Sequence, residues 1–153
     1  MAAPPTVLTI WRNLHLTDAT ICHELNARLT ARVGCSLTEH DVLAWVSAAP
    51  SQRLRMADLA GLLRVTPGGL TRIIDRTVER GWIQRDRPAD NRREVYAVLT
   101  SAGRSLLRSA RHTYLGALQE MIAGQLAEAD VSVLLNVSQK LLDNLNPDDG
   151  PCP

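Results

Sequence analysis

The sequence contains no phenylalanine, and aromatic residues make up only 3% of its 153 residues. A core must therefore be built from leucine, valine, isoleucine and alanine. Only three cysteines occur, without metal-site spacing, which excludes a disulfide framework and indicates a reducing compartment. No apolar run is long enough to cross a membrane, and residues 1–5 lack the charged start of a secretory signal. We therefore expect a cytoplasmic protein with no membrane partner.

Motifs of catalysis are also missing. The chain has no phosphate-binding glycine loop, no nucleophile elbow and no plausible pair of catalytic carboxylates. Its four histidines form no helical pairing with a cysteine or carboxylate that would hold a metal. We predict that the protein is not an enzyme and has no metal site and no cofactor.

Charge is distributed unevenly, although the net charge is only +1. Residues 53–111 hold 13 arginines against 6 acidic residues, whereas residues 112–153 hold one lysine against 6 acidic residues. A concentration of arginine in the middle of the chain is the electrostatic signature of a phosphate-binding surface. A chain of this length fits one domain, residues 1–153.

The pattern of residues 56–80 predicts a helix-turn-helix. Thr66 is a good N-cap, Pro67 suits the first helical position, and Gly81 can close the helix in a left-handed conformation. Between them, the apolar residues at helical spacing form one face: Leu70, Ile73, Ile74 and Val78. The opposite face carries glycine and charged residues, including Gly68, Gly69, Arg72, Asp75 and Arg76. An ordinary amphipathic surface helix is the alternative interpretation of this segment alone.

A β-hairpin is expected next, from a strand at 83–85, a charged loop at 86–93 and a strand at 94–99. Arg87, Arg92 and Arg93 in the loop suit the negative potential of a DNA minor groove. Asp90 can stabilise this wing by an ion pair with Arg92 or Arg93. A solvated charged hairpin is the alternative. Residues 53–55 are short enough for a third strand beside it.

This stretch resembles the wing signature of the multiple-antibiotic-resistance regulator (MarR) family. The resemblance is carried by Gly81-Trp82-Ile83-Gln84-Arg85, by Pro88-Ala89-Asp90-Asn91-Arg92-Arg93 and by Leu99-Thr100-Ser101-Ala102-Gly103, and residues 70–75 resemble the family's recognition helix. Val78 departs mildly from the leucine usual there. The resemblance implies a bacterial winged helix-turn-helix regulator, an obligate dimer whose DNA affinity changes with a small ligand or with cysteine oxidation.

The remaining segments predict a mainly α fold. A first helix is expected over residues 6–32, ending at Gly34, and a second begins where Thr38 caps and Asp41 is the acid three residues later. Residues 38–100 would form the winged helix-turn-helix DNA-binding lobe with its small antiparallel wing. Residues 6–34 and 101–145 would form the dimerisation helices, and 146–153 a disordered tail. A monomeric helical cap is the alternative for these helices.

The predicted function is a sequence-specific transcription regulator of double-stranded DNA, a homodimeric repressor acting on a pseudo-palindromic operator. The residues expected at DNA are Arg53, Arg55, Thr66, Gly68, Gly69, Thr71, Arg72, Arg76, Arg87, Arg92 and Arg93. Thr71 and Arg72 would read bases, and Arg53, Arg55, Arg76 and Arg93 would mainly hold phosphates. A winged-helix protein-interaction module without DNA binding remains an alternative.

A small aromatic ligand is expected to relieve repression. Its site would be lined by Trp11, His15, Trp45, Arg55 and Asp58, although both tryptophans could equally be core residues. A redox-responsive regulator is the alternative, but a buried and inert thiol is the expectation for Cys22. Cys35 is left open.

Overall fold

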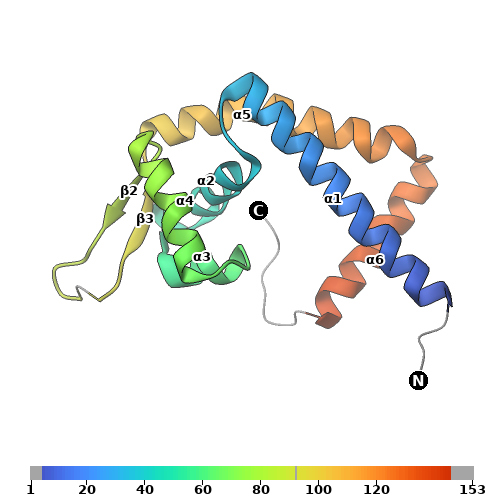
Figure 1. The fold of residues 1–153 in the computed structure, drawn as a ribbon, viewed down its shortest axis with the longest axis horizontal. Coiled ribbons are helices and arrows are strands. Elements are labelled where there is room, and N and C mark those ends of the chain that lie inside the picture. The colour runs from blue at the N-terminus through green and yellow to red at the C-terminus, as the bar shows by residue number, and fades with distance from the viewer. Residues whose placement is uncertain (1–4, 92, 146–153) are drawn as a thin grey trace.

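The computed structural model describes residues 5–91 and 93–145, arranged as a lobe from which three long helices extend (Figure 1). The lobe comprises α2, α3, α4 and a small sheet, and the long helices are α1, α5 and α6. In chain order the elements are α1 (Pro5–Val33), α2 (Leu37–Ala48), η1 (Pro50–Gln52), β1 (Arg53–Arg55), α3 (Met56–Leu62), α4 (Pro67–Glu79), β2 (Ile83–Asp86), β3 (Tyr96–Leu99), α5 (Ser101–Met121), η2 (Ala123–Gln125) and α6 (Glu128–Leu145).

The three strands form an antiparallel sheet in the order β1, β3, β2. Arg53 pairs with Val98 on one side of β3, and Ile83 pairs with Leu99 on the other. The loop between β2 and β3 projects from the lobe as the wing, residues 87–95 (Figure 1). The Glu94 N–H donates to the carbonyl of Asn91, a turn within the wing, so β3 starts two residues later than predicted.

One aliphatic cluster fills the lobe. Its buried residues come from α2, α3, α4, β2 and β3. Its buried members are Val42, Leu43, Val46, Leu59, Ala60, Leu70, Ile73, Ile74, Ile83, Ala97 and Leu99. Only one face of α4 packs against this cluster, so the other face of the helix lies at the surface. The lobe thus reaches a complete core without any phenylalanine, by close packing of branched side chains.

The helix ends follow the local signals, with one correction. Thr66 caps α4 by accepting a hydrogen bond from the Gly69 N–H at 3.2 Å, and Gly81 adopts φ +72° just past the helix, as predicted. The N-cap of α2 is Ser36 and not Thr38. Its partner in the capping box is Glu39, because a box needs the acid at the third helical position after the cap.

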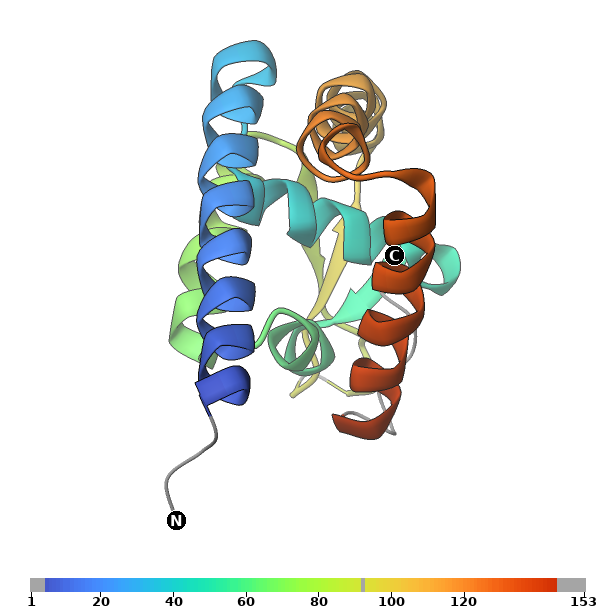
Figure 2. The same ribbon diagram turned by 90° about the vertical axis from the view of Figure 1, so that its right-hand side faces the viewer.

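The long helices bury far less than the lobe. α6 has no buried residue, and in α1 the buried side chains are Leu25 and Leu29. Figure 2 shows α1 along one side of the molecule and α6 along the other, with α5 seen end-on above α6. Large hydrophobic side chains remain exposed along these helices: Val7, Leu8, Ile10, Trp11, Leu14, Leu16, Leu115, Val133, Leu134, Leu135, Val137, Leu141, Leu142 and Leu145. This apolar face has no cover within the described chain.

Candidate nucleic-acid interface

Helix α4 is an amphipathic helix whose polar face is open to solvent. Leu70, Ile73 and Ile74 are buried, whereas Thr71 and Arg72 are exposed. The Thr71 hydroxyl donates to the carbonyl of Pro67 at 2.9 Å, which leaves its oxygen free to accept. A helix anchored on one side and carrying hydrogen-bonding groups on the other has the form required to enter a DNA major groove.

The two glycines at the start of α4 differ in what they need. A Cβ on Gly68 would have nothing within 4 Å, so its surroundings leave room for a side chain. A Cβ on Gly69 would lie 3.2 Å from the capping oxygen of Thr66. Gly69 therefore protects the cap, whereas the open space at Gly68 lets another molecule approach the backbone closely.

The arginines predicted to lie at DNA fall into two groups. Arg53 lies 2.8 Å from the Asp86 carboxylate and stacks on the Tyr96 ring, with its guanidinium carbon 3.5 Å from the ring centroid. Arg55 pairs with Glu94 at 2.9 Å and with Asp58 at 3.2 Å. These two predicted phosphate ligands therefore hold the base of the wing together.

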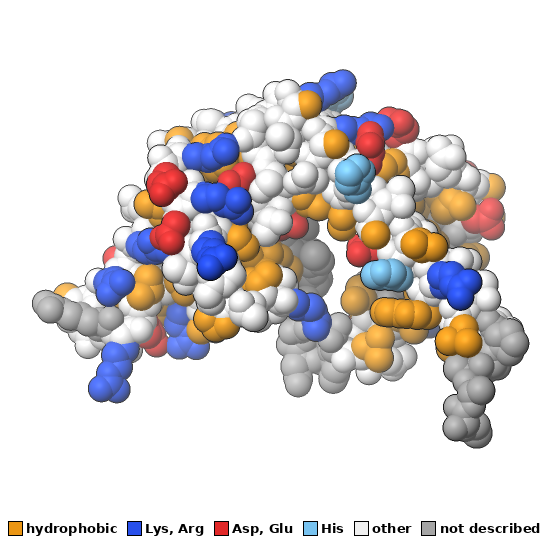
Figure 3. All heavy atoms as spheres, in the orientation of Figure 1, with side chains coloured by type: hydrophobic (Ala, Val, Ile, Leu, Met, Phe, Trp, Pro, Cys, Tyr) orange, Lys and Arg blue, Asp and Glu red, His pale blue; other side chains and the backbone are white. Residues whose placement is uncertain are grey.

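A second group of arginines is available to a ligand. Arg72, Arg87 and Arg93 are exposed and make no ion pair within the described residues. Arg76 is also exposed, with its Nε 3.9 Å from a Glu39 oxygen. Figure 3 shows basic side chains gathered over the lobe, whereas hydrophobic side chains follow α1 on the opposite side of the view. Arg92 lies outside the described residues, and Asp90 is exposed in the wing.

The polar cluster at the base of the wing is electrostatically tuned. The Tyr96 hydroxyl donates to Glu94 at 2.7 Å, and this bond together with Arg55 lowers the pKa of the Glu94 carboxyl. The bonds to Asp58 and Glu94 raise the pKa of Arg55. Glu94 and Arg55 thus stay charged over the ordinary pH range, and these contacts join β1 and α3 to β3 and the base of the wing.

The end of α4 is joined to the start of α5 by the Leu-Thr-x-x-Gly segment. The Thr100 hydroxyl lies 2.6 Å from the Gly81 carbonyl and accepts from the Gly103 N–H at 3.0 Å. A Cβ on Gly103 would lie 2.3 Å from the Trp82 carbonyl oxygen, so no other residue fits. The sequence signature therefore has a physical role: it sets how the end of α4 meets α5.

The predicted ligand residues are not brought together within one chain. Trp11 is 66% exposed on α1 and stacks on His15 with ring centroids 5.9 Å apart, whereas Trp45 packs against the lobe core. A cavity of about 530 Å³ beside the wing includes Arg55 but neither tryptophan. Its other lining residues are Met56, Ala57, Ala60, Pro67, Leu70, Thr71, Arg93, Glu94 and Val95.

The two described cysteines favour the thiol form. Burial raises the pKa of Cys35 from 9.0 to about 11, and burial together with the Asp18 carboxylate raises the pKa of Cys22. Cys152 lies outside the described residues. Within the described chain no group of three or more histidine, cysteine or acidic residues could hold a metal ion, and no helix has the length and apolarity to cross a membrane.

The arrangement of α3, α4, the sheet and its projecting loop defines a winged helix-turn-helix protein with helical extensions. Residues 35–95 match the model of the MarR family. On this match and the shared fold, residues 35–95 form a MarR family domain.

Solved structures have the same fold over nearly the whole chain. One of them is Sco3205, a MarR family transcriptional regulator from Streptomyces coelicolor, solved in complex with DNA. It is 20% identical in sequence with a TM-score of 0.84, and the matched region spans 100% of this chain and 96% of the Sco3205 chain. A MarR mutant from E. coli complexed with operator DNA is 25% identical, with a TM-score of 0.77 and coverage of 90% and 96%. BldR from Sulfolobus solfataricus is 24% identical, with a TM-score of 0.80 and coverage of 94% and 99%. Among curated protein sequences no significant match was found.

Proposed function

We propose that the protein is a transcription regulator that binds double-stranded DNA as a homodimer, and that it is not an enzyme. The observation that carries the proposal is the free polar face of α4 beside the wing. Its exposed Thr71 and Arg72 lie on a helix held by the lobe core, and the wing adds Arg87 and Arg93. Solved structures of the same fold include complexes with DNA, which supports the assignment.

The exposed apolar face of the long helices supports the dimer. It runs along α1 and along α6, and this much exposed apolar surface in a folded protein normally marks an interaction site. A second copy can cover it symmetrically, since a two-fold interface uses the same patch twice. Two-fold symmetry then predicts a near-palindromic operator with half-sites about 10 bp apart, one turn of the DNA helix.

Roles at DNA follow from the two arginine groups. Arg72, with Thr71, would read base edges, while Arg76 and Arg93 would hold phosphates and Arg87 would lie at the minor groove with Arg92. Thr66, Gly68 and Gly69 would let the start of α4 approach the DNA backbone. Arg53 and Arg55 act through the wing, because their carboxylate partners already occupy them. Asp90 would stabilise the wing.

Regulation by a small aromatic ligand, with loss of repression, is the second element of the proposal. The raised pKa of Cys35 and Cys22 disfavours the thiolate that oxidation requires, which favours a ligand over a redox signal. Trp11 and His15 belong to the apolar face of α1, so a ligand contacting them would meet the dimer interface. The same ligand would reach Trp45, Arg55 and Asp58 only through a second chain or a separate site.

The test is a selection of bound sequences from a random pool of duplex DNA, followed by affinity measurements on the enriched duplex at several salt concentrations. We expect an enriched near-palindrome and a steep fall of affinity with salt, because the contacts release counterions from phosphates. A protein that enriches no sequence and binds no duplex even in dilute buffer would contradict the proposal. A screen of aromatic acids on the enriched duplex then tests the ligand.

A further inference from the structure

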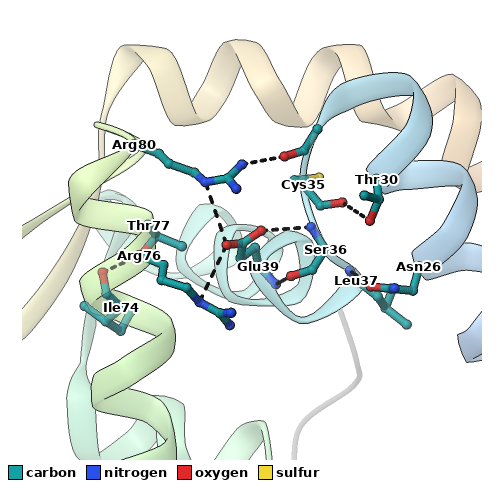
Figure 4. A network of polar contacts seen from close by, with 11 residues as sticks. Asn26, Thr30, Cys35, Ser36, Leu37, Glu39, Ile74, Arg76, Thr77 and Arg80 are labelled. Atoms are coloured by element: carbon teal, nitrogen blue, oxygen red, sulfur yellow. Dashed lines mark hydrogen bonds and ion pairs between the residues drawn. The ribbon is translucent and has the colours of Figure 1, made fainter.

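The carboxylate of Glu39 is buried between α2 and α4, behind the arginines of α4 (Figure 4). Its side chain is only 4% exposed. One oxygen, Oε2, accepts the Ser36 N–H at 2.8 Å and so completes the capping box of α2. A cap needs no more than this, and the carboxylate of an ordinary capping box lies at the helix surface. The burial of this group therefore calls for another partner.

The second oxygen of Glu39 faces the far half of α4. Oε1 lies 3.9 Å from Arg76 Nε and 4.0 Å from Arg80 Nε. Arg80 also donates to the carbonyl of Gly34, in the turn that joins α1 to α2. Burying a charged carboxylate is costly unless charged and hydrogen-bonding partners compensate, and these two guanidinium groups supply that compensation. Figure 4 shows both arginines directed from α4 toward Glu39.

The two arginines belong to a row with a third one. Arg72, Arg76 and Arg80 follow one another at intervals of four residues, so they lie along one side of α4. Holding the later two against α2 restricts rotation of the helix about its axis. This rotation decides where Arg72, at the opposite end of the row, points. A small rotation would move the Arg72 guanidinium off a base edge while leaving phosphate contacts within reach.

We propose that Glu39 is a positioning residue for DNA recognition: it fixes the rotation of α4 through Arg76 and Arg80, and so directs Arg72 and Thr71 at the bases. The inference rests on the proposed function, since it concerns how the same surface discriminates between sequences. Glu39 lies outside the interface, and this effect on sequence specificity is separate from its role in capping α2. Through Gly34 and Arg80, the same contacts connect the end of α1 to α4.

Glu39→Gln tests the proposal, because glutamine keeps the size and the acceptor that caps α2 but removes the charge facing the arginines. We expect affinity for the enriched duplex to fall relative to affinity for a scrambled duplex of equal composition, by between about two- and thirtyfold, the usual range for residues that act through a shared element. Loss of a negative charge alone would instead strengthen binding to both duplexes alike.

Two control variants separate positioning from charge and from capping. Glu79→Gln removes a charge from the exposed surface of α4 and should leave the ratio of the two affinities unchanged. Ser36→Ala removes the capping hydroxyl, which accepts the Glu39 N–H and has no hydrogen bond to either arginine, and should lower the melting temperature without changing the ratio. Equal ratios for wild type and Glu39→Gln would overturn the proposal. So would a Ser36→Ala variant that loses discrimination as strongly as Glu39→Gln.

A measurement without DNA provides a second check. Deuterium uptake of the segment 76–82 should be faster in Glu39→Gln than in wild type, because the end of α4 is no longer held by α2. Unchanged uptake there would contradict the inference. If wild-type protein enriches no duplex at all, the proposed function fails together with this inference. If wild type discriminates and Glu39→Gln discriminates equally well, only the positioning role fails.

Discussion

The lobe and the long helices contain the same kinds of aliphatic residue, but the lobe buries them in a core and the long helices leave many of theirs exposed. In the lobe, α4 alone contributes Leu70, Ile73 and Ile74 to a buried core. In α6, which is longer, no residue is buried, and Leu135 is 68% exposed. The lobe therefore buries its apolar surface within one chain, whereas the long helices leave much of theirs exposed in the single chain. Their composition alone does not distinguish the two regions, but their packing does.

The two regions also differ in the chemistry of what they leave exposed. The lobe exposes arginines, of which Arg72, Arg87 and Arg93 have no acidic partner within the described residues. The long helices expose leucine, valine and tryptophan (Figure 3). Unpaired guanidinium groups can bind phosphates and base edges, and an exposed apolar stripe can pack against the same stripe of a second copy. One region is thus suited to bind nucleic acid and the other to bind a second copy.

The largest expected effect comes from charging the apolar stripe. Leu134→Glu places a carboxylate in α6 at a side chain that is 43% exposed in one chain. If a second copy covers it, the dimer dissociates and the two half-sites are no longer bound together, so affinity for the enriched duplex falls by about 10²–10⁴-fold. Sedimentation and DNA titration measure the two consequences.

The matched control for this variant lies two residues further along α6. Asn136→Glu adds the same charge on the other side of the helix, because two residues rotate the helix by about 200°. It should leave the dimer and the DNA affinity unchanged. If Leu134→Glu kept the same mass and DNA affinity as Asn136→Glu and wild type, the stripe would have no partner and the contrast between the two regions would be wrong.

The next largest effect is expected in the lobe core. Ile74 is fully buried, so Ile74→Ala should lower the free energy of unfolding by about 2–5 kcal/mol, and Ile74→Val by about 0.5–1.5 kcal/mol. Chemical denaturation followed by circular dichroism gives both values. Since the lobe core is complete in one chain, this loss should not depend on protein concentration. A loss that disappears at high concentration would instead place Ile74 in an interface.

A smaller effect separates the arginines of α4. Arg72→Ala should cost about 1–3 kcal/mol on the enriched duplex and relax specificity at one base pair, because a base contact is lost. Arg76→Ala should weaken binding to all sequences and reduce the salt slope by about one, and because Arg80 still faces Glu39 it should lower discrimination less than Glu39→Gln does. Titrations of enriched and scrambled duplexes over a salt series distinguish them. Equal losses on both duplexes for Arg72→Ala would remove it from the base-reading residues.

The smallest effect concerns pH. The pKa of Cys35 lies at about 11 in the folded chain, above its value of 9.0 in the unfolded chain, so the unfolded chain loses the proton first as pH rises. The contribution of Cys35 to stability is therefore complete below pH 9.0 and is lost as pH rises toward about 11. Urea unfolding of wild type should weaken over this window relative to Cys35→Ala. Parallel curves for the two proteins would contradict the assigned burial.

Local signals of the sequence were sufficient for the outline of the fold. Thr66, Pro67 and Gly81 delimit α4 because caps and helix stops depend on neighbouring residues, and the three-residue strand at 53–55 was predicted with its exact bounds. The cap of α2 was misplaced because Ser36 and Thr38 are both acceptable caps with an acid three residues on. Only the folded chain shows that Glu39 has a second partner, which favours the Ser36 box.

The candidate site was harder to predict because its pairings are distant in sequence. Arg53 meets Asp86, and Arg55 meets Glu94, across 33 and 39 residues. A count of arginines in the sequence therefore cannot separate paired from unpaired arginines. The folded chain shows that Arg53 and Arg55 are already paired with carboxylates. The role of Thr100 and Gly103 was visible only as a family signature, since the carbonyl that excludes a side chain at Gly103 belongs to Trp82.

The most direct test of the account is the mass of the complex between the protein and the enriched duplex, measured by sedimentation equilibrium at several protein concentrations. We predict one duplex with two chains, a protein mass of twice the 16.8 kDa of one chain, and a free protein of the same dimeric mass. A single chain bound to the duplex, or a free protein that stays at the mass of one chain, would contradict it.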